Sequence, residues 1–352
     1  MSDEYLWDGS GAPDPELESL ELLLGQFRYS GRAPEFPERS RAFDWLRFRW
    51  RVPALASLAL LLAVAGVWLG KRRAGSPAAA ALRTAPGPAW SVGRLEGSPE
   101  INGERMGEAG RLGVGQWLET DGTSRAVVNI SSLGQVQVDP NTRLRFVAAR
   151  SGGNRMALAH GTIHAMTWAA PGKFVVDTPS AIAVDLGCAY TLSVNEQGSG
   201  LLRVSFGWVG FKLNQRESFI PEGAVCATRP GVGPGTPYFE DAPKDFRAAL
   251  ERLDFGAGDP SDRAAALRIV LNQARRRDAL TLWHLLSRVQ GFEKGAVYDR
   301  LATLVPPPRG VTKAGIVAGN QRLLDLWWNQ LGYGDMAWWR GWERTWSGPA
   351  TN

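Results

Sequence analysis

Two histidines near the middle of the chain are spaced in a way that suits metal binding. His160 and His164 lie four positions apart in a stretch that alternates like a β-strand, so both side chains would point to one face. A metal site needs further ligands, and no third nitrogen or thiolate is nearby in the sequence. We therefore favour partly buried strand histidines and predict no metal site. His284 falls within an apolar helical run and is expected on a helix face.

The chain contains two cysteines, Cys188 and Cys226, and both fall on predicted strands or strand edges of one domain. If that domain lies outside the cytoplasm, a disulfide between them is chemically permitted. The sequence does not show that the two residues are close in space, so the pair is a candidate disulfide only. No base or helix N-terminus is evident beside either thiol, and nothing indicates a reactive cysteine.

Signatures of common enzyme classes are missing from the sequence. It contains no GxSxG, no HExxH, no GxxxxGK(S/T) phosphate loop and no GxGxxG that opens a helix after a strand. Residues 231–237 (GVGPGTP) are rich in glycine but carry no lysine, which predicts a linker. We expect no catalytic residue, no cofactor and no enzymatic activity.

An uninterrupted apolar segment, VPALASLALLLAVAGVWLG, occupies residues 52–70. At about 1.5 Å per helical residue, its length matches the roughly 30 Å hydrocarbon core of a bilayer. Trp50 and Trp68 lie near its ends, where indole rings favour the membrane interface. The alternatives are a buried soluble helix and a cleaved signal peptide, but the run is long and a mostly polar stretch precedes it. The segment predicts one transmembrane helix that acts as a signal anchor.

Basic residues flank this segment on both sides and contribute much of the formal net charge of +5. Arg47, Arg49 and Arg51 precede it, and Lys71 and Arg72 follow it, so positive charge does not determine the orientation. The sequence has no basic and aromatic stripe of the type that nucleic-acid-binding modules carry, and we expect no nucleic-acid partner.

Composition divides the chain into regions with different structural preferences. They are residues 1–51 (a short head), 52–70 (the apolar segment), 71–89 (an Ala/Pro/Gly-rich linker), 90–228 (a β domain), 229–242 (a Gly/Pro linker) and 243–352 (a helical domain). In the β domain, turn residues separate short runs that are AVVNI, QVQVD, RLRFV, FVVDT, AIAVDL and LLRVSF. We predict an all-β fold of short strands, a sandwich, roll or β-solenoid-like domain, rather than a parallel α/β sheet.

The C-terminal region predicts an all-α domain of helical hairpins. Asp259 followed by Pro260 predicts a helix start, and this helix is expected to run to about Arg277. Later apolar stripes are Leu282, Leu285, Leu286 and Val289, then Val297, Leu301 and Leu304, then Leu323, Leu324, Trp327, Trp328 and Leu331. Trp338, Trp342 and Trp346 form one more helical stripe, for which core packing and a partner surface are both open interpretations.

Several blocks between residues 115 and 211 occur in an order and spacing that is fairly specific. They are LETDGTSRAVVNI, LGQVQVDPNTRLRF, MALAHGTIHAMT, FVVDTPSAIAVDLGCAYTLSV and LRVSFGWVGFKL. This stretch resembles the FecR-type domain, although Cys188 stands where that family usually has threonine after Leu-Gly. The resemblance implies an all-β extracytoplasmic domain on a single-pass protein of the cell inner membrane, with the C-terminal domains in the periplasm.

The resemblance also implies a regulatory role. In the best-understood members, a short cytoplasmic head binds an extracytoplasmic-function sigma factor while the outer domain responds to an outer-membrane receptor. The helical region here is not part of that receptor-coupled pattern. The alternative is an envelope scaffold or binding module that contacts an envelope protein or polysaccharide and has no sigma-factor role.

The head contains one candidate partner-binding helix. Leu17, Leu20 and Leu24 lie on one helical face, and Gly25 is a stop signal. A helix of about ten residues is marginal alone in water, so it would order against a partner or remain a nonspecific juxtamembrane segment. Anti-sigma heads of the zinc type use a His and Cys cluster, and this head contains neither residue.

Overall fold

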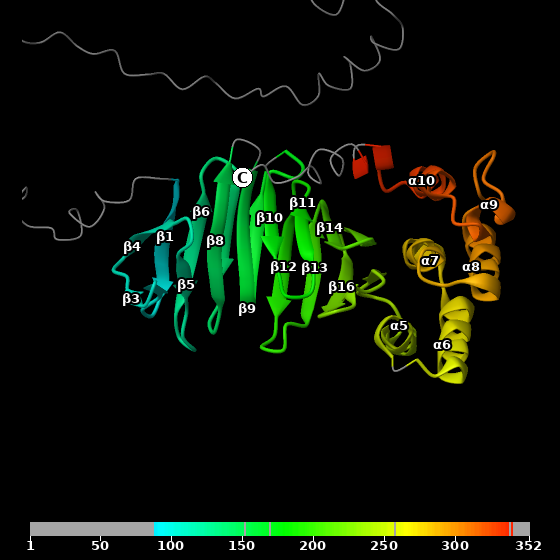
Figure 1. Ribbon diagram of the computed structural model, residues 1–352, viewed down its shortest axis with the longest axis horizontal. Helices are drawn as coiled ribbons and strands as arrows, with labels where there is room; N and C mark the ends of the chain where they lie inside the picture. Colours follow the sequence, from blue (N-terminus) through cyan, green and yellow to red (C-terminus); the bar gives the residue numbers. More distant parts are fainter. Residues whose placement is uncertain (1–87, 151–152, 169, 257, 338, 341–352) are drawn as a thin grey trace, which may run out of the picture. The chain divides into compact units, whose positions relative to one another are not determined.

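The computed structural model of the chain describes residues 88–150, 153–168, 170–256, 258–337 and 339–340. The predicted head helix with Leu17, Leu20 and Leu24 and the predicted membrane segment at 52–70 lie outside these ranges. Among the helices that are described, none is both long and apolar enough to span a bilayer. The described residues belong to one compact unit, which is mostly β-sheet and ends in helices (Figure 1).

The strands form two sheets that share one strand, β9. Sheet A contains, from edge to edge, β4 (Ala109–Gly113), β1 (Ala89–Glu96), β6 (Arg125–Ile130), β7 (Gly134–Val138), β9 (Gly153–Thr167), β12 (Ala189–Val194), β13 (Gly200–Phe206) and β16 (Ala224–Arg229), with β17 (Gly233–Pro234) and β18 (Tyr238–Phe239) on β16. Sheet B contains β3 (Glu104–Arg105), β2 (Glu100–Ile101), β5 (Trp117–Glu119), β8 (Arg143–Arg150), β9, β10 (Phe174–Asp177), β11 (Ile182–Asp185), β14 (Trp208–Leu213) and β15 (Arg216–Pro221).

The predicted strands form because their residues alternate between apolar and polar types. In β6, Ala126, Val128 and Ile130 are fully buried, whereas the residues between them face outward. The predicted all-β character of this region is confirmed. A β-solenoid would stack parallel strands, but β9 with β10 is the one parallel pair among the described strands. The arrangement is therefore closer to a roll.

Strand β9 passes from sheet B into sheet A at Gly161. Residues before it pair with β8 and β10, and residues after it pair with β7 and β12. Gly161 has φ +99°, and a Cβ placed there would lie 2.3 Å from the Cα of Thr142. A positive φ and this close approach both require glycine. The transfer of one strand between two sheets thus depends on this residue.

The two sheets face one another across a single apolar core. Trp90 of β1 in sheet A stacks on Phe146 of β8 in sheet B, with ring centroids 3.7 Å apart. The Nε1 of Trp90 also donates a hydrogen bond to Asn154 Oδ1 of β9 at 3.2 Å. Phe174 of β10 meets the same indole edge-on at 6.5 Å. These contacts bury a large aromatic surface between the sheets.

The helical region predicted at the C-terminus is confirmed. Its elements are α5 (Lys244–Phe255), α6 (Pro260–Gln273), the 3-10 helix η1 (Arg276–Asp278), α7 (Ala279–Leu286), α8 (Gly291–Leu304), α9 (Lys313–Val317) and α10 (Gln321–Gln330). Asp259 caps α6 by accepting a hydrogen bond from the backbone N–H of Ser261, and Pro260 occupies the first turn as predicted. Helix α6 ends before the expected Arg277, because the chain turns at Ala274 into η1.

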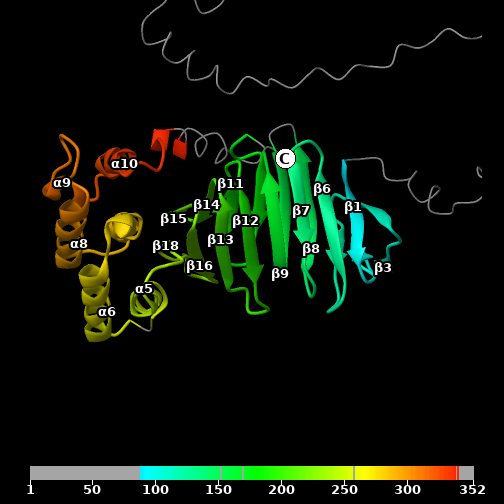
Figure 2. The ribbon, with the colours of Figure 1, turned by 180° about the vertical axis from the view of Figure 1, so that it is seen from behind.

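The helices are packed against the strands rather than separated from them by a linker. Residues 229–242, expected to be a linker, contain β17 and β18, which pair with β16. In both views the helices follow the strands β14 and β16 (Figures 1 and 2). Helix α5 packs on α6, and α8 packs on α7 and α9. Helix α7 is buried along its whole length. The strands and helices therefore share one core.

Candidate functional site: a groove between α5 and sheet A

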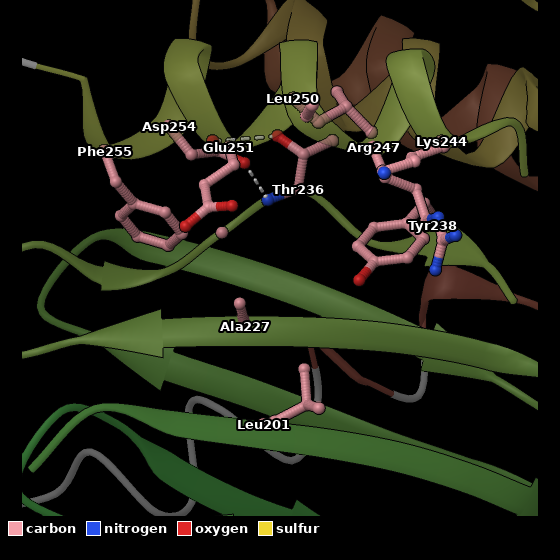
Figure 3. Close-up of a pocket in the computed structure, with 12 residues that line it drawn as sticks. Leu201, Ala227, Thr236, Tyr238, Lys244, Arg247, Leu250, Glu251, Asp254 and Phe255 are labelled. Atoms are coloured by element: carbon pink, nitrogen blue, oxygen red, sulfur yellow. Dashed lines mark hydrogen bonds between the residues drawn. The ribbon is translucent and has the colours of Figure 1, made fainter. Parts of the chain in front are cut away.

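A groove of about 470 Å³ lies between helix α5 and the outer face of strands β13 and β16 (Figure 3). Leu201 of β13 and Ala227 of β16 form its apolar floor, and these two residues are register partners in sheet A. Their neighbours Leu202 and Cys226 are buried in the core, so the alternation of the strands turns Leu201 and Ala227 outward. This volume falls in the range of small-ligand sites, roughly 300–1,000 Å³.

One end of the groove carries positive charge. Lys244 and Arg247 project from the first turns of α5 beside the ring of Tyr238 (Figure 3). Both cations are exposed, and neither forms an ion pair with any described residue. Burial raises the pKa of Tyr238, so its hydroxyl stays protonated and can donate a hydrogen bond. This end therefore suits an anionic group.

The other end of the groove is electrostatically balanced. Glu251, one turn further along α5, forms an ion pair with Arg229 at 2.7 Å. The Arg229 guanidinium also lies 4.7 Å from the ring centroid of Phe255. Because this pair is exposed on both sides, we expect it to contribute little stability. The unpaired charge of the groove is thus concentrated at Lys244 and Arg247.

A buried polar network connects α5 to the strands below the groove. The carboxylate of Asp254 accepts hydrogen bonds from the backbone N–H and the hydroxyl of Thr236, at 2.6 and 2.9 Å (Figure 3). It also accepts one from Arg216 Nη2 of β15 at 2.8 Å, and Arg288 Nη1 lies 3.5 Å away. The Asp254 side chain is 5% exposed. These bonds hold α5 in a defined position over the sheet.

Arg288 is the second cation of this network, and it is more deeply buried than Arg216. Its Nη2 donates to the Glu217 carbonyl at 3.0 Å and to the Ser218 hydroxyl at 2.6 Å, and its side chain is 6% exposed. Burial lowers the pKa of Arg288 to about 10, so it remains charged at neutral pH. Two guanidinium groups therefore share the single carboxylate of Asp254, which leaves excess positive charge beneath the groove.

The thiol beneath the groove is not activated as a nucleophile. Cys226 is the thiol nearest to the network, and its Sγ donates a hydrogen bond to the carbonyl of Gly235 at 3.2 Å. Burial raises the pKa of Cys226 to about 12, which keeps the thiol protonated. The groove therefore offers an anion positive charge and hydrogen-bond donors.

Comparisons with known proteins do not assign the chain to a family. No family model matches it, and no curated protein matches it. Two crystal structures of a "putative anti-sigma factor from Parabacteroides distasonis ATCC 8503", at 1.65 and 2.50 Å resolution, show a weak structural likeness. The identity is 15% and the TM-score 0.31, over 39% of this chain and 64% of that one, which is just under two thirds of its length.

In the structure His160 and His164 have different polar neighbours. His160 Nδ1 lies 3.2 Å from the carbonyl of Asn141, whereas His164 contacts Asp139 Oδ2 at 2.8 Å and Thr191 Oγ1 at 2.9 Å. Gly161 separates them at the point where β9 changes sheets. No group of three or more His, Cys, Asp or Glu side chains suited to a metal ion occurs among the described residues.

The candidate disulfide is not formed. Cys188 and Cys226 are both buried free thiols in this structure. Cys226 donates a hydrogen bond to Gly235 beneath the groove, while Cys188 immediately precedes β12 and lies beside Asp185. Strands β12 and β16 lie on opposite sides of β13 in sheet A, so the two cysteines have different neighbours.

The groove residues are ones that the sequence did not single out. Lys244, Arg247, Glu251 and Asp254 recur at helical spacing, and this periodicity was the one local signal for them. A charged stripe of this kind is found on most solvated helices, so it does not by itself indicate a site. Trp342 and Trp346 of the predicted stripe lie outside the described residues, and so does Trp338.

Proposed function

We propose that this chain is a membrane-anchored regulatory protein of the FecR type. In this proposal the unit of strands and helices lies outside the cytoplasm and binds an anionic envelope ligand in the groove. The head at residues 1–51 binds an extracytoplasmic-function sigma factor through Leu17, Leu20 and Leu24. The apolar segment at 52–70 joins the two as a single membrane span.

The observation that carries the proposal is the groove with its two unpaired cations, Lys244 and Arg247. A ligand there would contact α5 and sheet A at once. A ligand shifts a conformational equilibrium only if it binds two states with different affinity. Because the groove is formed by two different elements, a small change in the position of α5 would alter its width and its affinity. The resemblance of residues 115–211 to the FecR-type domain implies that the signal passes from the outer domain to the head.

The groove is tested by ligand binding to the full chain in detergent. A fluorescent peptide of eight glutamates serves as the anionic probe, and Lys244→Ala combined with Arg247→Ala removes the two cations. We expect the double variant to weaken binding by about tenfold or more, since each lost charge-assisted contact is worth roughly 1 kcal/mol. Arg252→Ala, an exposed cation of the same helix that does not line the groove, is the matched control and should bind normally.

The head is tested by capture of sigma factors with the full chain. Co-purification of one sigma factor, lost when Leu17, Leu20 and Leu24 are changed to Ala, supports the relay. Recovery of no sigma factor with an intact protein contradicts it. Anion binding in the groove without a sigma factor would then favour the alternative, an envelope scaffold or binding module.

A further inference from the structure

A second cavity, of about 260 Å³, lies where α10 and the segment after it meet strands β14 and β15. Five aromatic residues line it, which are Trp208, Phe219, Trp328, Tyr333 and Trp339. Trp328 and Trp339 are almost fully buried, whereas Trp208 and Tyr333 are half-buried. The cavity is distinct from the groove under α5, since the two share no lining residue.

The aromatic rings are set at steep angles to one another. Trp208 and Tyr333 have ring centroids 5.9 Å apart and an interplanar angle of 76°, and Trp208 and Trp328 are 5.8 Å apart at 59°. Phe219 and Trp339 meet edge-on at 4.8 Å. Rings in this arrangement can present more than one π face to a single guest. Each π face carries partial negative charge, which attracts a cation.

The charged residue of this cavity is negative, as is the partial charge on the faces of the aromatic rings. Asp335 is the one charged residue among the described residues that line the cavity. Its Oδ1 accepts hydrogen bonds from Ala337 N at 2.8 Å and from Asn329 Nδ2 at 3.2 Å, which fixes the carboxylate in place. Arg277, whose carbonyl accepts a hydrogen bond from the Tyr333 hydroxyl, is itself paired with Asp241 at 2.6 Å. The cavity therefore has uncompensated negative character.

We propose that this cavity binds a quaternary ammonium group. Such a cation has no N–H to donate and is weakly hydrated, so aromatic walls can replace its water without leaving donors unsatisfied. A primary ammonium group would need several acceptors, and Asp335 is one carboxylate. The volume suits a trimethylammonium head rather than a large ligand. Asp335 supplies the counter-charge at the opening.

The test uses the full chain in a maltoside detergent, which contains no choline group. Tetramethylammonium and choline are titrated by calorimetry and by tryptophan fluorescence, with sodium chloride at matched ionic strength. The neutral isostere 3,3-dimethyl-1-butanol has the shape of choline without its charge. Saturable binding of both cations, with the isostere at least about fivefold weaker, is expected for a cation–π site.

Two variants assign this binding to the cavity. Asp335→Asn keeps an acceptor for Ala337 but removes the charge, and Trp208→Leu removes one ring. Each should weaken tetramethylammonium binding by about fivefold or more. Trp117→Leu removes a half-buried indole that borders Arg143 elsewhere in sheet B, and it should leave binding unchanged. Asp335 is exposed, so its variant is expected to fold even if the Trp208 variant does not.

Three outcomes would overturn the proposal: no saturable binding, equal binding of the neutral isostere, or equal affinity in wild type and Asp335→Asn. A comparison of choline with phosphocholine then identifies the source of the group. Stronger binding of choline assigns a free solute, and stronger binding of phosphocholine assigns a lipid headgroup. Both results support a quaternary ammonium site.

Discussion

The Nε2 of His284 accepts a hydrogen bond from the backbone N–H of Phe219 at 2.9 Å, and this contact joins helix α7 to the edge strand β15. Two positions earlier on that strand, the carbonyl of Glu217 accepts a hydrogen bond from Arg288 at 3.0 Å. Alternate residues of a strand direct their backbone groups to the same side, here away from β14. Side chains of the helical region thus occupy an edge that would otherwise be open to pairing with another chain.

This contact predicts that the protein loses stability in acid. Burial lowers the pKa of His284 from 6.5 to about 3, and the charge of Arg288 acts in the same direction. The Nδ1–H donates to the Leu280 carbonyl at 2.8 Å, so only neutral imidazole leaves Nε2 free to accept from Phe219. Between pH 6.5 and 3 the unfolded chain binds one more proton at this site than the folded chain does.

The free energy of unfolding should therefore fall by about 1.4 kcal/mol per pH unit through this window from His284 alone. Urea unfolding of the wild type is compared with His284→Gln, whose side-chain oxygen is an acceptor that does not titrate. The variant should show a shallower loss between pH 6 and pH 4. Parallel profiles for the two proteins would contradict the assignment, because other groups titrate equally in both.

Arg288 should be the cation on which folding depends most. Replacement by Met removes its bonds to Ser218 and to the Glu217 carbonyl and leaves polar atoms buried without a partner. We expect a loss of about 3–5 kcal/mol, measured by urea unfolding. The control is Arg229→Met, whose exposed pair with Glu251 should be worth less than about 1 kcal/mol. Equal losses in the free energy of unfolding for the two variants would contradict the prediction that the buried cation matters more.

Gly161 should tolerate no side chain. Gly161→Ala adds a Cβ that would lie 2.3 Å from backbone and side-chain atoms of Thr142, at a positive φ, and should destabilise by about 2–5 kcal/mol. Gly103→Ala is matched to it, because Gly103 has φ +80° but no atom within 4 Å of its added Cβ. That variant should lose only the conformational term, about 1–2 kcal/mol. Thermal unfolding distinguishes the two.

Both cysteines should stay reduced and unreactive in the folded protein. Burial is the main cause that raises the pKa of Cys188 and of Cys226, in the latter to about 12. An aromatic disulfide reagent at pH 8 should modify neither thiol until the protein is unfolded. Intact mass spectrometry of protein exported to an oxidising compartment should find two free thiols. A mass lower by about two hydrogens would show that the cysteines pair after all.

Local sequence patterns predicted the secondary structure well, for reasons that concern short distances along the chain. The alternation in β6 and the cap at Asp259 each depend on residues only a few positions apart. Such patterns could not show that β9 enters both sheets, because an apolar and polar alternation is the same in either sheet. They also could not show that residues 229–242 pair with β16 as β17 and β18.

The sequence by itself predicted the longer strands and the helices but not β17 and β18, and it predicted a membrane segment and a partner-binding head. Only the tertiary structure decided which distant residues meet. Phe219 and His284 are 65 positions apart, and Thr236 and Arg288 are 52 positions apart. The groove likewise combines Leu201 with Arg247, which belong to different elements. Such contacts depend on how whole elements pack in one core, and no periodicity within a single element contains that information.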